Sequence, residues 1–339
     1  MRKSFLFGIL ALIAGLSMAV AAEAGSPEIF RIGTGGTSGT YYPVGQAIAE
    51  AISNPGRKQD CGRYGCGVPG LLAIPQTSNG SVANIEDIHH RKVESGFSQS
   101  DVAYWATTGS GIFSKLGNYE DVAAIASLYM ENIHLVARKG SGIRSIYDLV
   151  GKRVSLDDPG SGTLVDARII LNAFGIDEKD MKAQYVKPAA AMKKMRAGSL
   201  DAFFIVAGSP SKAIVALADE DLITLINIEG SVVDQIIHDN SFFSRQVIPA
   251  GSYKGIGEIK TLGVAALWVV RKDEDPKKIY AITRSFWQLL PEIAKPGSHP
   301  KLKQISLETA FDSMSVPLHP GALKYYHEIG LNIPDGPSN

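Results

Sequence analysis

The chain of 339 residues has no excess of either charge, since 34 Lys and Arg residues balance 34 Asp and Glu residues. It also lacks the long blocks of Lys and Arg with which proteins bind nucleic acids or anionic membranes. We therefore expect neither nucleic acid nor a membrane surface as a partner. If the protein recognises charge, it must do so at a local site.

Long apolar runs are absent after residue 20. The single run, from Phe5 to Val20, follows Arg2 and Lys3 and precedes Ala22-Glu23-Ala24. This order of basic residues, apolar run and small-residue site is typical of a secretory signal peptide. The run is short for a transmembrane helix, although an uncleaved N-terminal anchor is the alternative. We predict a signal peptide over residues 1–24 and a mature chain in the periplasm.

Cysteine is scarce, and both cysteines fall in the segment "CGRYGCGVPG", as Cys61 and Cys66. In an oxidising compartment, two close cysteines in a Gly-rich loop favour a small disulfide that pins a surface loop. A zinc site would need more ligands, and no His is near in sequence. Thiol exchange is a further alternative, but the spacing is not C-x-x-C.

The familiar catalytic and nucleotide-binding motifs are missing as well. Gly39 is not followed by Lys, as a P-loop requires, and Ser38 occupies the third glycine position of a G-x-G-x-x-G fingerprint. No G-x-S-x-G or H-E-x-x-H segment occurs. His134 lies in an apolar segment and is interpreted as structural. We expect no enzyme activity, no cofactor and no metal.

What the sequence does contain is a repeated alternation of short apolar strands and amphipathic helices, which predicts parallel sheets covered by helices. The pattern runs from "IFRIGTGG" to "SGFSQSDVAYWAT" and restarts at "YDLVGKRVSLDDPG". Between the two units, "DVAAIASLYMENIHLVAR" is too long for an ordinary strand and is expected to cross between two lobes. The apolar segment "TLGVAALWVV" is expected to carry the chain back.

Four strand-to-helix junctions share a composition of Gly and small polar residues. They are Gly35-Gly36-Thr37-Ser38-Gly39-Thr40, Thr77-Ser78-Asn79-Gly80-Ser81, Ser98-Gln99-Ser100-Asp101 and Gly160-Ser161-Gly162-Thr163. Such junctions lie at the carboxyl edge of a parallel sheet, where ligands bind, and the helix N-termini attract anions. For each junction alone, ordinary helix capping is the favoured interpretation, and a hairpin turn at Asn79-Gly80 is a further alternative. Together they indicate a shared site for a small organic anion.

These segments also carry a resemblance to a known family. "IGTGGTSGTYYPVGQAIA", "QTSNGSVANIEDI", "SGFSQSDVAYWA", "LYMENIHLVARKGSGIRSIYDLVGKRVSLDDPGSGT", "DAFFIVAG", "IPAGSYKGI" and "PLHPGALKYYHEIG" occur in order over residues 29–331. The ordered set closely resembles the TAXI family, the solute receptors of tripartite ATP-independent periplasmic (TRAP) transporters. The resemblance implies an α/β, bilobed periplasmic-binding-protein fold of type II, with two lobes joined by two hinge strands.

The resemblance further implies a ligand site between the lobes for glutamate, 2-oxoglutarate or a similar small carboxylate, delivered to a TRAP permease. The expected lobe boundaries are 25–133 and 263–339 for the first lobe and 134–262 for the second, in a monomer. The implied ligand-binding residues are Gly36, Thr37, Ser38, Gly39, Thr40, Tyr41, Asn79, Gly80, Ser81, Gln99, Ser100, Asp101, Tyr129, Ser161, Gly162, Thr163, Phe204 and Ala207. No arginine is assigned to the ligand, because Arg168 lies more than a turn inside its helix. The lengthened "CGRYGCGVPG" loop departs from the family pattern, so the ligand's identity is not carried over.

Two rival functions remain open from the sequence alone. A binding protein of an ATP-driven importer or a signalling receptor would look similar. A secreted hydrolase or lyase would need a base beside a Ser or Thr nucleophile, and only Asp101 or His134 could serve.

Overall fold

The computed structural model describes residues 26–56 and 65–333. The signal-peptide segment and Cys61 lie outside the described residues, so the cleavage site and the Cys61–Cys66 disulfide stay predictions. Within the described ranges, no helix combines the length and hydropathy that crossing a bilayer requires.

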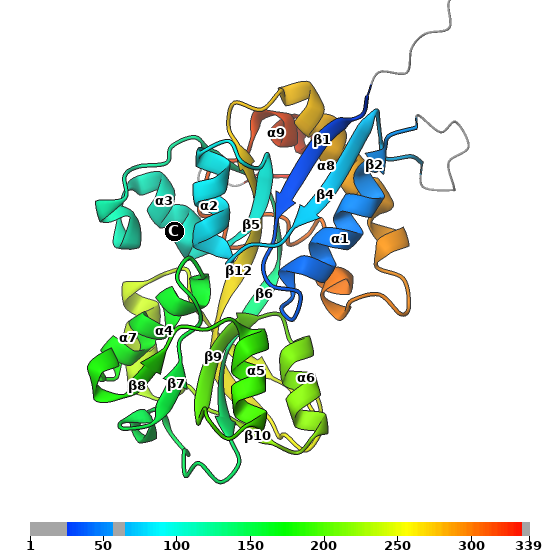
Figure 1. Cartoon of the computed structure of the whole chain (residues 1–339). Coiled ribbons are helices and arrows are strands. Elements are labelled where there is room, and N and C mark those ends of the chain that lie inside the picture. The colour runs from blue at the N-terminus through cyan, green and yellow to red at the C-terminus, as the bar shows by residue number, and fades with distance from the viewer. Residues whose placement is uncertain (1–25, 57–64, 334–339) are drawn as a thin grey trace, which may run out of the picture.

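Two α/β lobes share one described ten-stranded sheet, whose main path runs β4-β1-β5-β12-β6-β9-β7-β8 (Figure 1). Strand β10 pairs with β6, and strand β11 pairs with β12. The long antiparallel strands β6 (Val122–Arg138) and β12 (Ile259–Arg271) belong to both lobes. The predicted crossing strands are thus confirmed, and so is the bilobed α/β class.

The first lobe contains β1, β4 and β5, the first half of β6 and the second half of β12. Its elements are β1 (Glu28–Gly33), α1 (Tyr41–Ile52), β2 (Ser53–Asn54), β3 (Val68–Pro69), β4 (Leu71–Gln76), α2 (Ser81–His89), β5 (Ser95–Gln99), α3 (Ser100–Thr108), η1 (Gly111–Lys115), α8 (Pro276–Ile293), η4 (Pro300–Gln304) and α9 (Pro320–Glu328). We call this part lobe 1.

The second lobe, lobe 2, is built on β7, β8, β9 and β10 with the remaining halves of the two long strands. Its elements are η2 (Ile146–Leu149), β7 (Arg153–Ser155), α4 (Gly162–Ala173), η3 (Glu178–Asp180), β8 (Lys182–Gln184), α5 (Pro188–Arg196), β9 (Ala202–Ala207), α6 (Lys212–Asp219), β10 (Ile223–Ile226), α7 (Ser231–Asp239) and β11 (Ser244–Ile248). Helix α7 and strand β11 were not foreseen in the sequence, where they lie in a mixed polar and apolar stretch.

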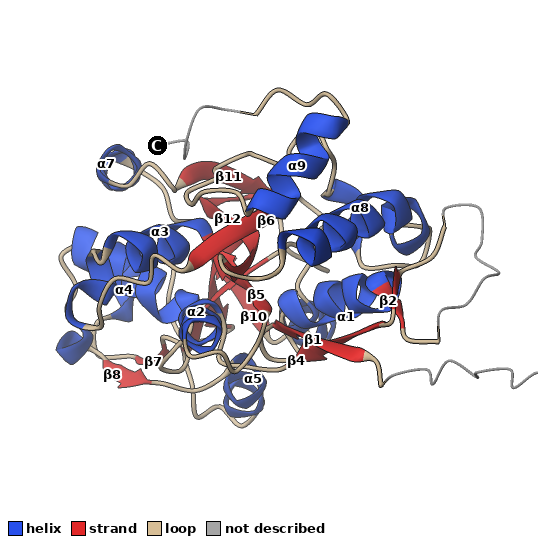
Figure 2. Cartoon of the chain, turned by 90° about the horizontal axis from the view of Figure 1, so that it is seen from above, coloured by secondary structure: helices blue, strands red, loops and turns tan. Residues whose placement is uncertain are grey.

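Helices cover both faces of the sheet in each lobe, as parallel strands require. In lobe 1, α1, α8 and α9 bury one apolar cluster and α2 and α3 bury another, and Figure 2 shows these groups on opposite sides of the strands. The pattern in α8 explains its place: Ile279, Ile282, Phe286 and Leu290 recur every three or four residues and are all buried. In lobe 2, α4 and α7 cover one face and α5 and α6 the other.

One buried polar residue fixes the edge of lobe 1 where strands end and helices begin. Asn84 of α2 is fully buried, and its amide donates to the carbonyl oxygens of Thr34 and Phe97 at 2.7 Å each. Its donor group is therefore satisfied by the ends of two neighbouring strands, β1 and β5. The junctions after these strands are held side by side.

Candidate ligand-binding site

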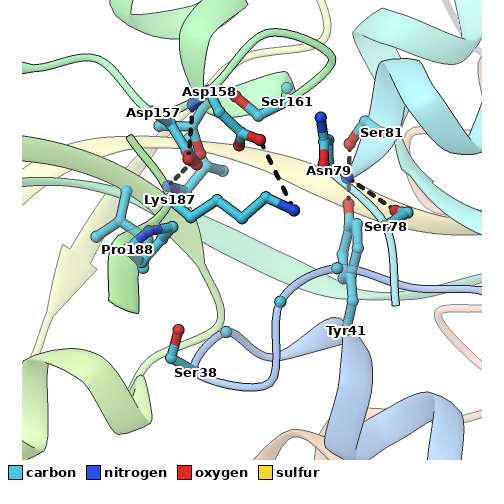
Figure 3. A pocket seen from close by; sticks show the side chains of 18 of the residues that line it. Ser38, Tyr41, Ser78, Asn79, Ser81, Asp157, Asp158, Ser161, Lys187 and Pro188 are labelled. Atoms are coloured by element: carbon cyan, nitrogen blue, oxygen red, sulfur yellow. Dashed lines mark hydrogen bonds and ion pairs between the residues drawn. The ribbon is translucent and has the colours of Figure 1, made fainter. Parts of the chain in front are cut away.

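A cavity of about 270 Å³ lies between the lobes. Figure 3 shows side chains of lobe 1 and lobe 2 facing each other across it. The lining residues are Gly35, Gly36, Thr37, Ser38, Gly39, Thr40, Tyr41, Thr77, Ser78, Asn79, Gly80, Ser81, Gln99, Glu131, Asp157, Asp158, Ser161, Gly162, Thr163, Lys187, Pro188, Ala189, Ile205 and Val206.

Within the described part of the chain, five helices begin at this cavity: α1, α2 and α3 from lobe 1, and α4 and α5 from lobe 2. A helix N-terminus presents N–H groups without intrahelical acceptors and carries partial positive charge. In α4, the Ser161 side chain accepts from the Leu164 N–H and caps the helix. Among the described residues, α1, α2, α3 and α5 have no such side-chain cap. Backbone carbonyls accept some of their first-turn N–H groups: the Ala83 N–H of α2 donates to Gly160 of lobe 2 at 3.0 Å, and the Ala190 N–H of α5 donates to Lys187 at 2.9 Å.

The two lobes touch around the cavity, so the structure is a closed form. On one side, the Thr40 hydroxyl donates to the Gly208 carbonyl at 3.2 Å, and the Ala213 N–H donates to Ser38 at 3.3 Å. On the other side, the Asn79 amide donates to Pro159 at 2.9 Å. Contacts between the lobes therefore flank the cavity on both sides.

A further interlobe contact is made by the Gln99 side chain of lobe 1, whose amide N–H donates to the Asp166 carboxylate of lobe 2. The same Gln99 side chain accepts from the Ser81 hydroxyl at 3.1 Å. Gln99 therefore links two helix N-termini of lobe 1 to α4 of lobe 2, directly at the wall of the cavity.

The cavity also carries acidic side chains that the sequence analysis did not single out. Glu131 of β6 accepts a hydrogen bond from the Tyr41 hydroxyl at 2.7 Å, and burial raises the pKa of Glu131 to about 8. Burial likewise raises the pKa of Asp157 to about 8. Both carboxyls therefore hold a proton through much of the neutral range, so they add less negative charge than their number indicates.

One cation faces these acids in the cavity. Lys187, the residue before α5, extends its side chain toward Asp158, as Figure 3 shows, and the two charged groups are 3.8 Å apart. That distance is too long for a direct hydrogen bond. The Lys187 side chain is about half exposed and that of Asp158 is 13% exposed, so a small solute could reach both groups.

The structure brings together most of the residues expected to bind a ligand. Those that line the cavity are Gly36, Thr37, Ser38, Gly39, Thr40, Tyr41, Asn79, Gly80, Ser81, Gln99, Ser161, Gly162 and Thr163. The junction at Asn79-Gly80 precedes helix α2, so it is no hairpin turn. Whether these residues bind a ligand stays a prediction.

Five of the expected residues lie elsewhere. Ser100 and Asp101 are fully buried in the first turn of α3, behind Gln99, because only the N-cap of that helix reaches the cavity. Phe204 and Ala207 of β9 belong to the apolar cores of lobe 2, since alternate residues of a covered strand face helices on both sides. Tyr129 lines a different cavity, described below.

The charged residues of the cavity that were not predicted from the sequence have only weak local patterns that could have indicated them. Asp157 and Asp158 directly precede the "PGSGT" turn, and their position at a strand end was a usable hint. Lys187 follows strand β8 and stands before a proline at a helix start, the same kind of junction as the other four. Glu131 gave no signal, because it lies inside the crossing strand.

Two α/β lobes joined by two long strands, with a polar cavity between them, define a bilobed type II periplasmic-binding-protein fold. A structure from Bordetella bronchiseptica RB50 is similar to the chain at 16% identity and a TM-score of 0.53, covering 91% of this chain and 83% of that one. That likeness shows the fold.

Two further structures are similar at lower overlap. The alkanesulfonate-binding protein SsuA from Xanthomonas axonopodis pv. citri bound to MOPS is 16% identical, with a TM-score of 0.46, and the match covers 89% of this chain and 84% of that one. The GluR0 ligand-binding core from Nostoc punctiforme in complex with L-glutamate is 15% identical, with a TM-score of 0.44 and coverage of 81% and 96%.

The NMT1-like family matches residues 32–330, nearly the whole described chain. The protein therefore belongs to the NMT1-like family, a type of periplasmic substrate-binding protein. Within that class, it is a solute-binding protein with its candidate site between the lobes.

Proposed function

We propose that this protein is the periplasmic receptor of a TAXI-type TRAP transporter and that it captures a small carboxylate such as glutamate between its lobes. The ordered motifs over residues 29–331 support the transporter class, and the junction loops that converge at the cavity support the ligand class. The ligand binds one lobe and favours closure, and the membrane subunit distinguishes the closed form from the open one.

The observation that carries the ligand proposal is the combination of helix N-termini with an opposed pair of charges. Helix N-termini receive a carboxylate through their free N–H groups. Lys187 and Asp158 are close enough to attract each other but too far apart to bond directly. A solute with a carboxylate and an ammonium group can therefore pair with both, the carboxylate with Lys187 and the ammonium with Asp158.

The size of the cavity agrees with a ligand of this kind. About 270 Å³ lies just below the usual range for small-molecule sites, which favours a solute of amino-acid size over a larger one. The charge of the wall also suits a zwitterion. Glu131 and Asp157 hold protons, so the opposed charges are those of Asp158 and Lys187.

We expect isothermal titration calorimetry at pH 7 to give L-glutamate an affinity at least tenfold higher than that of 2-oxoglutarate. The two differ at the group that would meet Asp158, an ammonium in one and a keto oxygen in the other. The Asp158→Asn variant should lose this discrimination by weakening L-glutamate alone. The exposed Asp219→Asn is the matched control and should leave both affinities unchanged.

Equal affinities in the wild type would contradict the role of Asp158. If neither acid binds and no other small carboxylate raises the melting temperature, the ligand class itself is wrong, because a cleft ligand stabilises the protein by mass action.

A second prediction compares a residue in the wall of the cavity, Thr163, with a nearby exposed residue, Arg168. The Thr163 hydroxyl accepts the Val206 N–H at 3.1 Å, and Thr163 is 5% exposed. Thr163→Val leaves that buried N–H without its acceptor, which costs about 1–3 kcal/mol and distorts the lobe 2 wall. We expect L-glutamate affinity to fall about tenfold. Arg168→Gln should change it by less than about twofold, because the exposed Arg168 pairs with Glu178. Calorimetry that finds equal losses would refute this assignment.

The transporter class is tested separately from the ligand. We expect the gene to lie beside a TRAP membrane subunit, and uptake by that subunit in vesicles without ATP to depend on this receptor. A neighbouring ATP-binding cassette gene and ATP-dependent uptake would favour the rival class of importer.

A further inference from the structure

A second cavity, of about 500 Å³, is lined by residues of both lobes. Lobe 1 contributes Ser127, Lys301 and Asp312 to its wall, and lobe 2 contributes Ser209, Gln246 and Ser252. Tyr129, which the sequence placed in the ligand set, lines this cavity instead. Because both lobes build the wall, the shape of the cavity depends on the angle between them.

The second cavity holds a cation in a fixed position. Lys301 is 4% exposed, and its ammonium donates to the Met130 carbonyl at 2.9 Å and to the Gln304 side chain at 2.8 Å. An ammonium has three N–H donors, so one is left for another acceptor. Burial lowers the pKa of Lys301 to about 8, and the nearby Glu131 opposes that shift, so the amine is still mostly charged at pH 7.

The remaining wall is rich in neutral hydrogen-bonding groups. Hydroxyl and amide side chains from both lobes line it, and Asp312 supplies a carboxylate acceptor. The Tyr129 ring lies 5.8 Å from the Lys301 ammonium, and its buried hydroxyl has no hydrogen-bond partner among the described residues. Such a wall recognises hydroxyl groups, while a single buried cation recognises one anionic group.

We infer that the second cavity binds a small hydroxylated organic acid, whose carboxylate pairs with Lys301 and whose hydroxyl groups bond to the polar side chains of both lobes. A volume of about 500 Å³ is within the range of small-molecule sites and exceeds that of the first cavity. This site is separate from the one assigned to the transported solute.

Occupation of the second cavity is coupled to closure. Ser209, in its wall, directly follows Gly208, which accepts the hydrogen bond from Thr40 at the edge of the first cavity. The Lys301 side chain packs tightly against Gly208, where an added Cβ would lie 2.6 Å from the lysine Cε. An acid that contacts both lobes favours the closed form, so it raises the affinity for the solute in the first cavity, and the solute raises its affinity in return.

The test uses D-gluconate as the probe and the whole mature chain. We expect calorimetry to show one gluconate bound per chain, both alone and with saturating L-glutamate, and tighter in the second case. Lys301→Met keeps the packing against Gly208, removes the charge and should weaken gluconate at least tenfold. Val247→Trp places a large side chain at the half-exposed rim of the cavity and should do the same. Val150→Trp, at a similarly exposed position outside both cavities, should change the affinity less than twofold.

Three results would overturn the inference: no gluconate binding to the wild type, displacement of L-glutamate by gluconate, or unchanged gluconate affinity in both cavity variants. The titration without L-glutamate does not require the first cavity to bind that amino acid. Failure of the proposed solute and failure of this second site are therefore distinguishable.

Discussion

Replacing Gly162 by alanine should lower the affinity for L-glutamate at least 30-fold while leaving the fold intact. A Cβ at position 162 would lie 1.3 Å from Oε1 of Gln99 and 2.9 Å from the Ser81 hydroxyl, both on the opposite lobe. Closure is then possible only if the Gln99 side chain leaves its bonds to Ser81 and Asp166. Two buried hydrogen bonds lost at about 1–3 kcal/mol each correspond to a 30-fold or larger loss.

The open form has no such overlap, because the two lobes are apart. Gly162 also stands at the start of α4 with an ordinary backbone angle, where alanine is a better helix former than glycine. We therefore expect the melting temperature without ligand to stay the same or rise. Small-angle X-ray scattering should find that L-glutamate compacts the wild type but not the variant.

Gly257→Ala is the matched control, since a Cβ at this exposed position meets nothing within 4 Å. It should bind and close as the wild type does. An alanine at position 162 that binds with unchanged affinity would mean that the contact between Gln99 and α4 is no part of the closed, ligand-bound form.

Prediction from sequence succeeded where a local pattern is sufficient. The 17-residue segment of β6 is mostly apolar and too long for a strand of one lobe, and the crossing was predicted from that length. The junction loops were found because Gly, Ser and Thr before an amphipathic helix indicate a strand-to-helix turn whatever the partners are. Parallel strands then bring such turns to one edge.

The acidic and cationic side chains of the site could not be found in this way. Glu131 is one of a run of buried residues in β6, and only the position of Tyr41 on α1 shows that it faces the first cavity. Lys187 meets Asp158 across a turn that depends on how β7, β8 and α5 pack. Tyr129 lies two residues from Glu131 but reaches the second cavity, a distinction that requires the full three-dimensional path of the hinge.

Closure should also take up a proton, so that L-glutamate affinity falls as the pH rises above about 4. Asp101 of lobe 1 and Asp166 of lobe 2 are both fully buried in the closed form, and neither has an ion-pair partner in the described part of the chain. Burial raises the pKa of Asp101 to about 6. Burial first, and then the charge of Asp101, raise the pKa of Asp166 well above its usual range.

The direction follows from the proton balance. In an open form that exposes both carboxyls to water, they titrate near their ordinary pKa of about 4. In the closed form at least one holds a proton at pH 7, so the closed form binds more protons than the open form. The closed form therefore has its full proton-linked advantage below about pH 4. As the pH rises from there to the raised pKa values, the affinity for L-glutamate falls by up to tenfold per pH unit for each proton taken up, and above those values it levels off. The raised pKa of Glu131 acts in the same direction, whereas the lowered pKa of Lys301 acts in the opposite one near pH 8.

The Asp166→Asn variant tests whether the pair of Asp101 and Asp166, and not Glu131, takes up the proton. The amide keeps the shape of the carboxyl and removes its charge, so Asp101 no longer faces a second acid. We expect the variant to bind L-glutamate at pH 8.5 at least as tightly as the wild type and with a flatter pH dependence. Calorimetry at pH 7 in buffers of different ionisation enthalpy should show proton uptake by the wild type that the variant reduces, while the Asp219→Asn control retains it. A wild type that takes up no proton, or a variant with the wild-type slope, would mean that the two carboxyls are already shielded from water in the open form.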